Sequence, residues 1–197
     1  MLLDDIRDYK VYLASKSPRR RELLAGMGVD FEVIATDVNE TFNPEDSPQD
    51  IVMHLSRLKL SPINLADYND KTIFITCDTI VVRDGKIIGK PHDRLEAVEM
   101  LRMLSGNTHT VYSGLTVATP SRQLTDYRAT EVTFDPISDE MIDFYIDTYK
   151  PFDKAGSYGV QEWIGYVGIS EVHGSFYNVM GLPTRLLWQM LSDLIRK

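Results

Sequence analysis

Cysteine is almost absent from this sequence, and its scarcity removes two classes of site. The 197 residues contain one cysteine, Cys77. A single thiol forms no disulfide within the chain and assembles no cysteine-based zinc site. The four histidines show no HxxxH or HExxH spacing, so a histidine-based metal site is disfavoured as well. The sequence therefore gives no sign of a structural zinc.

An excess of positive charge and long apolar runs are also missing. The net charge of −8 argues against general binding to nucleic acid or anionic membrane, because that binding depends on Lys and Arg that neutralise phosphates. A few local cations would still suffice for a small phosphorylated ligand. The first residues, MLLDDIRDYKVYL, carry acids where a signal peptide carries positive charge, and no stretch approaches the roughly 18 apolar residues of a membrane span. We therefore expect a cytoplasmic protein without nucleic-acid or membrane partners.

Composition and pattern predict one α/β domain. Hydrophobic residues make up 43% and charged residues 25% of the chain, which is ordinary for such a protein. No linker or repeat divides residues 1–197, so a single domain is expected. Predicted strands and helices alternate, and Asp84-Gly85 between two β-branched runs indicates an antiparallel hairpin, so the sheet is expected to be mixed. We expect strands over residues 10–14, 31–36, 72–82, 108–118 and 124–134.

Capping residues and prolines mark the expected helices. Ser and Asp favour the N-cap because their side-chain oxygens accept a hydrogen bond from a free backbone N–H of the first turn. The predicted helix starts are Ser17, Ser47, Asp93, Ser138 and Pro183. Pro62 is expected to end or kink the second of these helices. The glycine-rich and aromatic stretch 156–172 is expected to form loop and short strands.

The segment Ser15-Lys16-Ser17-Pro18-Arg19-Arg20-Arg21 is the first candidate site. It lies between a predicted strand and a predicted helix, where free backbone N–H groups and the helix dipole attract an anion. Guanidinium groups add planar donors that pair two phosphate oxygens at once. A capped surface helix with solvated arginines is the alternative, but three arginines in a first turn oppose the dipole. We therefore predict a phosphate-binding turn.

Asp78 is the second candidate because it follows the apolar run 73–77. A carboxylate at the end of a buried strand is unfavourable unless it is paired, hydrogen-bonded or bound to metal, and ligand sites of α/β sheets gather at such strand ends. Taken alone, Asp78 could equally cap a turn. Cys77 has no evident positioned base, so a buried structural thiol is predicted there.

Three further charged residues are weak signals by themselves. Lys90 lies in Gly89-Lys90-Pro91, Lys59 on the helix that begins at Ser47, and Glu40 in Asn39-Glu40-Thr41. Each is individually more typical of a solvated surface residue. Their interest lies in the expectation that they converge with the arginine turn and Asp78.

Six segments, in this order and at this spacing, resemble the Maf family. They are SKSPRRRELL, the NET acid, CDTIV, GKP followed by a capped helix, LSGNTHTVYSG and DKAGSYGVQ. The resemblance extends from about Tyr12 to Leu191. It implies an inosine-triphosphate-pyrophosphatase-like α/β fold, with an elongated mixed sheet flanked by helices and two lobes around a deep cleft. It also implies a nucleoside triphosphate as small-molecule substrate, a divalent metal, usually Mg²⁺, and a homodimer.

The resemblance also assigns expected roles to single residues. Asp78 matches the catalytic acid that accepts a proton from the attacking water. The positions that set substrate choice correspond to Arg20, Thr79 and Gln161. The remaining cleft positions correspond to Ser15, Arg19, Glu40, Lys59 and Lys90. Glu40 and Asp78 are expected to hold the metal with phosphate oxygens, and the base and metal roles of Asp78 are both left open.

The segment DKAGSYGVQ resembles the subgroup that hydrolyses dTTP and UTP to the monophosphate and pyrophosphate. The amide of Gln161 offers a donor and an acceptor to the carbonyl–NH edge of uracil or thymine, a pattern that cytosine lacks. One alternative is a 7-methyl-GTP pyrophosphatase with the same chemistry. Another is a nucleotide-sensing regulator linked to septum formation, against which the intact Asp78, Glu40 and both lysines argue.

Overall fold

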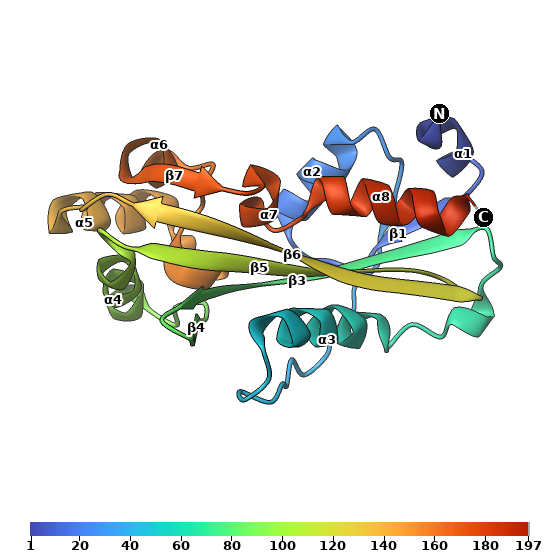
Figure 1. Cartoon of the computed structure of the whole chain (residues 1–197), viewed down its shortest axis with the longest axis horizontal. Coiled ribbons are helices and arrows are strands. Elements are labelled where there is room, and N and C mark those ends of the chain that lie inside the picture. The colour runs from blue at the N-terminus through green and yellow to red at the C-terminus, as the bar shows by residue number, and fades with distance from the viewer. Residues whose placement is uncertain (197) are drawn as a thin grey trace. The chain divides into compact units, whose positions relative to one another are not determined.

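The computed structural model describes residues 1–196, in which seven strands form one sheet (Figure 1). The strands are β1 (Lys10–Leu13), β2 (Glu32–Val33), β3 (Thr72–Arg83), β4 (Lys86–Ile88), β5 (Thr108–Thr119), β6 (Arg122–Phe134) and β7 (Ile169–His173). Their order is β2-β1-β3-β5-β6-β7, with β4 paired to β3. β1 pairs in parallel with β2 and β3, whereas the pairs β3/β4 and β6/β7 are antiparallel. The predicted mixed α/β sheet is confirmed.

Helices connect the strands, and their starts follow the predicted caps. The helices are α1 (Leu2–Ile6), α2 (Pro18–Gly26), α3 (Pro48–Leu60), α4 (Arg94–Leu104), α5 (Asp139–Tyr149), α6 (Trp163–Gly168), α7 (Phe176–Met180) and α8 (Thr184–Ile195), with 3-10 turns η1 (Leu65–Asp67), η2 (Pro151–Asp153) and η3 (Ala155–Ser157). The side chains of Ser17, Ser47, Asp93 and Ser138 each accept a hydrogen bond from the backbone N–H three residues on. α3 ends at Leu60, before Pro62. Among the helices of the described chain, none is long and apolar enough to cross a membrane.

Two predicted segments differ from the structure. The strand expected over residues 31–36 is reduced to Glu32–Val33, because β2 is the last strand in the order and pairs only with β1. The stretch 156–172, expected to be loop and short strands, contains the helix α6 before β7. A Cβ on Gly165 would lie 1.9 Å from the Val160 carbonyl oxygen. The first turn of α6 therefore packs closely on the loop that directly precedes it, a local contact that composition does not signal.

Interior contacts divide the chain into two compact units. Unit 1 comprises Met1–Asp78, Ser113–Arg128 and the described residues from Gly181 onward; unit 2 comprises Thr79–Tyr112 and Ala129–Met180. The strands β3, β5 and β6 contribute residues to both units. The single domain and the deep cleft inferred from the sequence stay predictions.

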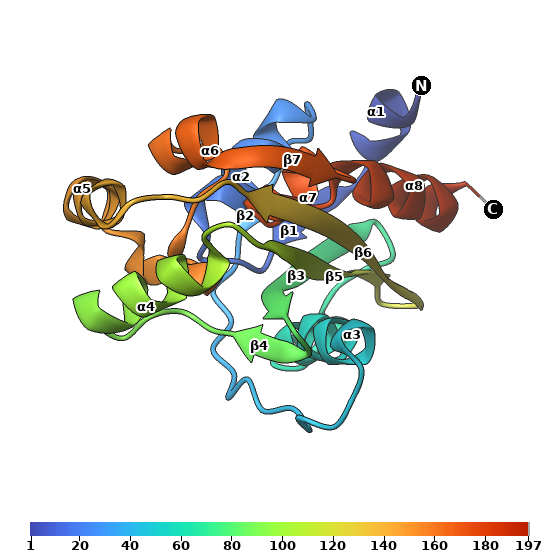
Figure 2. The same cartoon turned by 60° about the vertical axis from the view of Figure 1, so that its left-hand side comes forward.

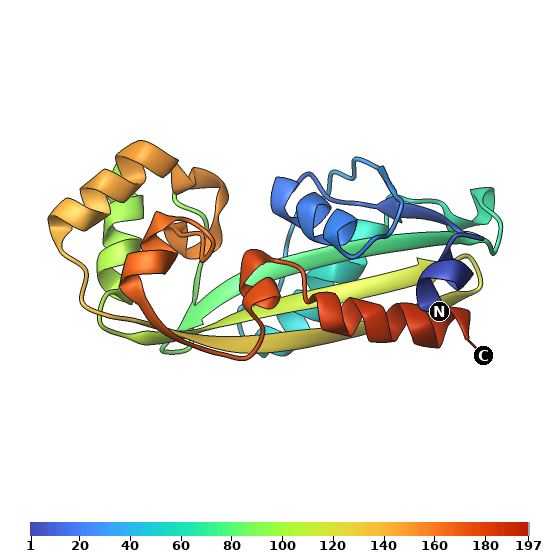
Figure 3. The same cartoon turned by 90° about the horizontal axis from the view of Figure 1, so that it is seen from above.

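Unit 1 has helices on both faces of its strands. α3 covers one face, and α2 and α8 cover the other (Figures 1 and 3). Phe74 of β3 stacks on Tyr12 of β1 with ring centroids 5.4 Å apart, inside a cluster that includes Leu60 of α3. α1 lies beside α8, where Arg196 forms an ion pair with Asp5 at 3.0 Å. This apolar cluster thus fixes α3 relative to β1 and β3.

The backbone of α3 lies directly against β5. A Cβ on Gly114 would lie 2.0 Å from the Val52 carbonyl oxygen, so only glycine fits there. One turn further on, the Ser56 hydroxyl lies 2.9 Å from the Thr116 hydroxyl, and Thr76 Oγ1 donates to the Ser56 carbonyl oxygen at 2.6 Å. These contacts set the position of the last turn of α3, which carries Lys59.

Unit 2 packs α4 beside α5 (Figure 2). Arg94 at the start of α4 reaches Asp143 at 2.7 Å and Asp147 at 3.0 Å on α5. The β3/β4 hairpin has positive φ angles at Asp84 (49°) and Gly85 (74°). Both central residues therefore adopt the conformation of a type I′ turn, as their sequence predicted.

Candidate active site

The predicted phosphate-binding turn connects β1 to α2 in unit 1. Ser17 caps the helix by accepting from the Arg20 backbone N–H at 3.5 Å, and Pro18 occupies its first turn. The buried Ser15 hydroxyl accepts from the Ser17 backbone N–H at 3.2 Å. Arg19 is half-buried on the same turn. The expected connection of a strand to a capped helix is therefore present, and binding of an anion at this turn stays a prediction.

Arg20 is anchored rather than solvated. Its Nε donates to the Gly181 carbonyl oxygen at 2.8 Å, and Nη1 donates to the Cys77 carbonyl oxygen at 2.7 Å and to Ser15 Oγ at 3.4 Å. The guanidinium is thus fixed to the residue that immediately precedes Asp78. Cys77 is buried, and its thiol donates to the Gly181 carbonyl oxygen at 3.2 Å, in agreement with the predicted structural role.

Asp78 shares one ammonium group with Glu40. Lys59 Nζ bonds to Asp78 Oδ1 and lies 3.2 Å from Glu40 Oε1. The side chains of Asp78, Lys59 and Glu40 are 9%, 15% and 51% exposed. A carboxylate as buried as that of Asp78 requires such a counter-charge. The three residues, separated by up to 38 positions in the sequence (78 − 40), are therefore brought together by the fold of unit 1.

The two carboxylates suit a hard divalent cation. Their oxygens lie close enough to share one cationic group, the Lys59 ammonium, and Mg²⁺ is usually held by one or two carboxylates together with substrate phosphates and water. Within residues 1–196, no group of three or more His, Cys, Asp and Glu side chains is arranged to hold a metal. Glu40 and Asp78 therefore fit a metal that is completed by its substrate, rather than one caged by protein alone.

The remaining predicted residues belong to unit 2. Thr79 directly follows Asp78 in β3 and is half-buried, and Lys90 is exposed after β4. The Gly156 backbone N–H donates to the Gly89 carbonyl oxygen at 3.0 Å, which joins the segment of Lys90 to the loop that leads to Gln161. Gln161 Oε1 is buried and has no hydrogen-bond partner in the part of the chain that the structure describes. That oxygen is thus a hydrogen-bond acceptor that no described residue satisfies.

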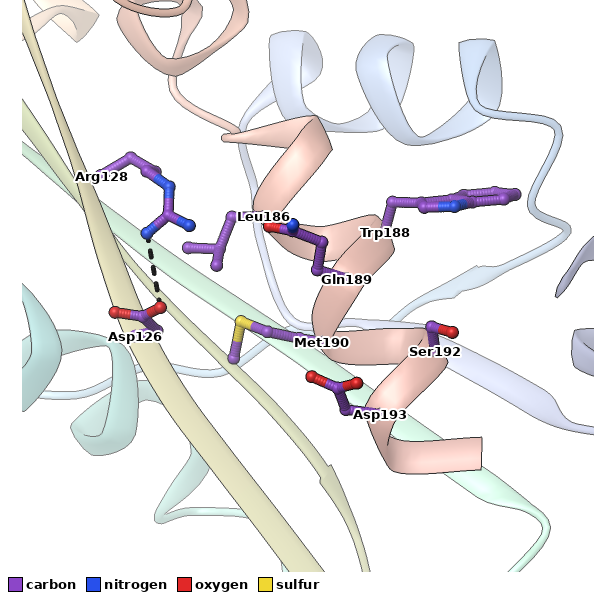
Figure 4. Close-up of a pocket in the computed structure, with 8 residues that line it drawn as sticks. All are labelled: Asp126, Arg128, Leu186, Trp188, Gln189, Met190, Ser192 and Asp193. Carbon is purple, nitrogen blue, oxygen red and sulfur yellow. Dashed lines mark hydrogen bonds and ion pairs between the residues drawn. The ribbon is translucent and has the colours of Figure 1, made fainter. Parts of the chain in front are cut away.

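A hollow on unit 1 involves none of the predicted residues. It has a volume of about 450 Å³ and is lined by residues of β6 and α8, namely Asp126, Arg128, Leu186, Trp188, Gln189, Met190, Ser192 and Asp193. Figure 4 shows Leu186 and Met190 on the side of α8 that faces β6, with Trp188 on the other side. Arg128 and Asp126 form an ion pair across its rim at 3.4 Å.

Known proteins resemble this chain over nearly its whole length. It is 46% identical over 98% of its residues to a dTTP/UTP pyrophosphatase of Porphyromonas gingivalis, 98% of which is covered. Proteins of the same name from Bacteroides thetaiotaomicron and Flavobacterium johnsoniae are 45% and 38% identical over 98% and 99% of this chain and 100% of their own lengths.

One solved structure, a nucleoside-triphosphatase / dITP/XTP pyrophosphatase of Mycobacterium abscessus, aligns with a TM-score of 0.39 at 15% identity, over 64% of this chain and 72% of that one. That likeness is too weak to support a conclusion about fold or activity. The model of the family described as Maf-like protein matches residues 10–194. Because that match spans nearly the entire sequence and the full-length relatives are at least 38% identical, the chain belongs to the Maf-like protein family.

Proposed function

We propose that this chain is a cytoplasmic nucleoside triphosphate pyrophosphatase that hydrolyses dTTP and UTP to the monophosphate and pyrophosphate. The observation that carries the proposal is the buried Asp78, whose carboxylate shares the Lys59 ammonium with Glu40. The anchored arginine turn beside it supplies the cations that a triphosphate needs. The names and full-length similarity of the relatives support the choice of substrate.

The cationic residues bind the triphosphate. Catalysis of phosphoryl transfer depends on positioning and charge neutralisation more than on covalent chemistry by the protein. Arg19 and Arg20 pair with phosphate oxygens at the start of α2, and Lys59 and Lys90 neutralise further oxygens. Because Arg20 is already held by two carbonyl oxygens, little of its side-chain entropy remains to be lost on binding.

Asp78 directs the attacking water. Its carboxylate accepts a proton as the water oxygen attacks the α-phosphorus, the bond from that phosphorus to the bridging oxygen breaks, and pyrophosphate leaves. Lys59 holds Asp78 Oδ1, so the carboxylate keeps one orientation. Glu40 and Asp78 are the residues that would hold Mg²⁺, which when bound supplies charge stabilisation to the phosphate oxygens.

Gln161 selects the base. Its unpartnered Oε1 accepts from the ring N–H of uracil or thymine, and its amide NH₂ donates to an adjacent carbonyl. Cytosine presents no ring N–H at that position, so a buried acceptor would stay unpaired with CTP. Sites built on hydrogen bonds reject such a mismatch more strongly than apolar pockets do.

The test is release of pyrophosphate from a panel of triphosphates with Mg²⁺. We expect dTTP and UTP to be the best standard substrates, CTP and the purine triphosphates to be poor, and excess chelator to abolish turnover until Mg²⁺ is restored. If 7-methyl-GTP is cleaved faster than dTTP and UTP, the proposed substrate is wrong, but the proposed pyrophosphatase reaction stands. Tight nucleotide binding without any pyrophosphate would favour the sensing regulator instead.

We also propose a homodimer, as the resemblance implies. Sedimentation equilibrium at several protein concentrations gives the mass directly. A single species of about 22.5 kDa would contradict it.

A further inference from the structure

Glu162 lies at the centre of a polar network in unit 2. Its Oε2 accepts a hydrogen bond from the Tyr145 hydroxyl of α5, and its Oε1 lies 3.1 Å from Lys154 Nζ. The Tyr145 oxygen in turn accepts from the Gly159 backbone N–H at 2.9 Å. Lys154 also reaches Asp153 at 2.8 Å. The carboxylate therefore joins a helix, a lysine and a loop.

The network closes the turn that contains Gln161. The Glu162 backbone N–H donates to the Gly159 carbonyl oxygen at 3.0 Å, so residues 159–162 form a tight turn. The Tyr145 hydroxyl accepts a hydrogen bond from the backbone N–H of Gly159, the first residue of this turn. The same hydroxyl donates to the side-chain carboxylate of Glu162, the last residue of the turn. Gln161 is the third residue, between these two fixed points. Its backbone is held from both ends by one phenol group.

Close packing leaves this turn little freedom. A Cβ on Gly159 would lie 2.7 Å from Glu162 Cδ and 3.1 Å from Gln161 Nε2. The carboxylate and the amide therefore pack on the same bare face of Gly159. A side chain other than hydrogen at Gly159 would displace one of them.

The charged residues of the network are largely buried, and a contribution to the stability of the fold does not by itself explain why charged residues lie there. The side chains of Glu162 and Lys154 are 18% and 9% exposed, and Tyr145 is fully buried. Buried ion pairs seldom stabilise a fold more than apolar side chains of the same volume would, and their best-attested use is to specify one arrangement. Burial, followed by the adjacent Glu162, raises the pKa of Tyr145 far above its usual range, so its hydroxyl stays a donor.

We propose that Glu162 and Tyr145 are positioning residues that hold the Gln161 amide in the orientation that distinguishes uracil and thymine from cytosine. The inference rests on the base-reading role given to Gln161 in the proposed function. Neither residue touches the substrate; both act through the turn 159–162. The buried, unpartnered Gln161 Oε1 is what such a device would present, because a freely rotating amide would find a partner in solvent.

The experiment compares kcat/KM for UTP and CTP in Tyr145→Phe, Glu162→Gln and Gln161→Ala. Tyr145→Phe removes only the oxygen that links Gly159 to Glu162. We expect the UTP-to-CTP ratio to fall by ~10-fold or more, with kcat for UTP within ~3-fold of wild type. Glu162→Gln keeps an acceptor of the same shape, so its UTP-to-CTP ratio should lie between those of wild type and Tyr145→Phe. This variant tests the proposal if Tyr145→Phe does not fold.

Matched controls separate positioning from general destabilisation. Tyr149→Phe alters the ring that stacks on Tyr145 at 5.2 Å on the same helix, and Glu171→Gln alters an exposed carboxylate of β7; both should keep the wild-type ratio. The double variant Tyr145→Phe/Gln161→Ala should be no less selective than Gln161→Ala alone, because both changes act on one amide.

Each result decides a different statement. If Gln161→Ala loses selectivity while folded Tyr145→Phe and Glu162→Gln keep it, or if the effects of Tyr145→Phe and Gln161→Ala add, the positioning role is wrong and the proposed function stands. If Gln161→Ala itself keeps selectivity, the positioning role and the base-reading role are both wrong. If wild type releases no pyrophosphate from UTP, the proposed function fails first.

Discussion

Replacing Gly114 of β5 by alanine should disturb both the stability of unit 1 and its chemistry. The added Cβ would lie 2.0 Å from the Val52 carbonyl oxygen, 2.3 Å from its carbonyl carbon and 2.8 Å from the Met53 nitrogen. These are backbone atoms in the middle of α3, so no side-chain rotation relieves the overlap. Restoring a separation of about 3.5 Å requires the helix to move by roughly 1.5 Å.

The magnitude follows from what that movement breaks. Overpacking a close-packed interior destabilises by ~1–3 kcal/mol, and a clash with helix backbone belongs at the upper end. A loss of ~3 kcal/mol corresponds to a fall in Tm of roughly 6–12 °C for a chain of this size. The movement also carries Lys59, in the last turn of α3, away from Asp78. Since a shift of ~1 Å in a catalytic group can lower turnover by ~10²-fold, we expect a loss of that order even where the variant is folded.

The assay is thermal unfolding together with pyrophosphate release from UTP, measured well below the Tm of the variant. Gly26→Ala is the matched control, since a Cβ at the end of α2 would meet no described heavy atom within 4 Å beyond its own helix and chain neighbours. Alanine there should leave stability unchanged or raise it by up to ~1 kcal/mol. If Gly114→Ala melts within about 1 °C of wild type and keeps its turnover, the close contact between β5 and α3 does not exist as described.

Three further predictions test the site and the interior of unit 2. Asp78→Asn should lower turnover by ~10²-fold or more while the circular dichroism spectrum stays native; near-wild-type turnover would remove Asp78 from the chemistry. Arg20→Ala loses the bonds to two carbonyl oxygens, and its kcat/KM should fall by roughly 30-fold, or ~2 kcal/mol; unchanged kinetics would mean that the anchored guanidinium contributes nothing to the substrate. Burial, and then the charge of Arg83, lowers the pKa of His109 to about 4. Between that value and 6.5 the unfolded chain binds a proton that the folded chain does not, so the free energy of unfolding should fall by about 3 kcal/mol as pH drops through this window. His109→Gln should remove that slope in urea titrations at several pH values, and an unchanged slope would contradict the assignment.

Local signals in the sequence were sufficient for the elements that the chain builds from its own neighbours. The cap at Ser138, for example, depends on a hydroxyl and a backbone N–H three residues away, and the hairpin depends on Asp84 and Gly85 alone. Where the outcome depends on close packing that residue type does not reveal, the prediction failed. The residues that became α6 contain two glycines and two β-branched residues, a poor helix composition that contact with Val160 overrides.

In the candidate site, too, the residues could be predicted from local sequence but their contacts could not. Sequence reasoning identified Asp78, Lys59 and Glu40 separately, but the sharing of one ammonium by two carboxylates depends on how α3 docks on β3 and β5. The carbonyl oxygens of Cys77 and Gly181 that hold Arg20 could not be predicted at all, because every residue has a backbone carbonyl. Tyr145 and Glu162 were missed because neither carries a motif of its own.

The division of the chain also bears on how it folds during synthesis. The backbone leaves unit 1 after Asp78, returns at Ser113, leaves again after Arg128 and returns at Gly181. The helix α8, which buries Leu187 and Leu191 in unit 1, therefore emerges from the ribosome long after β1 and α3. Contacts between segments this distant close slowly, since the entropy of a long loop is lost before the contacts form. A nascent chain that stalls before Gly181 would hold an incomplete unit 1 with its apolar face exposed, which makes that stage of synthesis the one most exposed to aggregation.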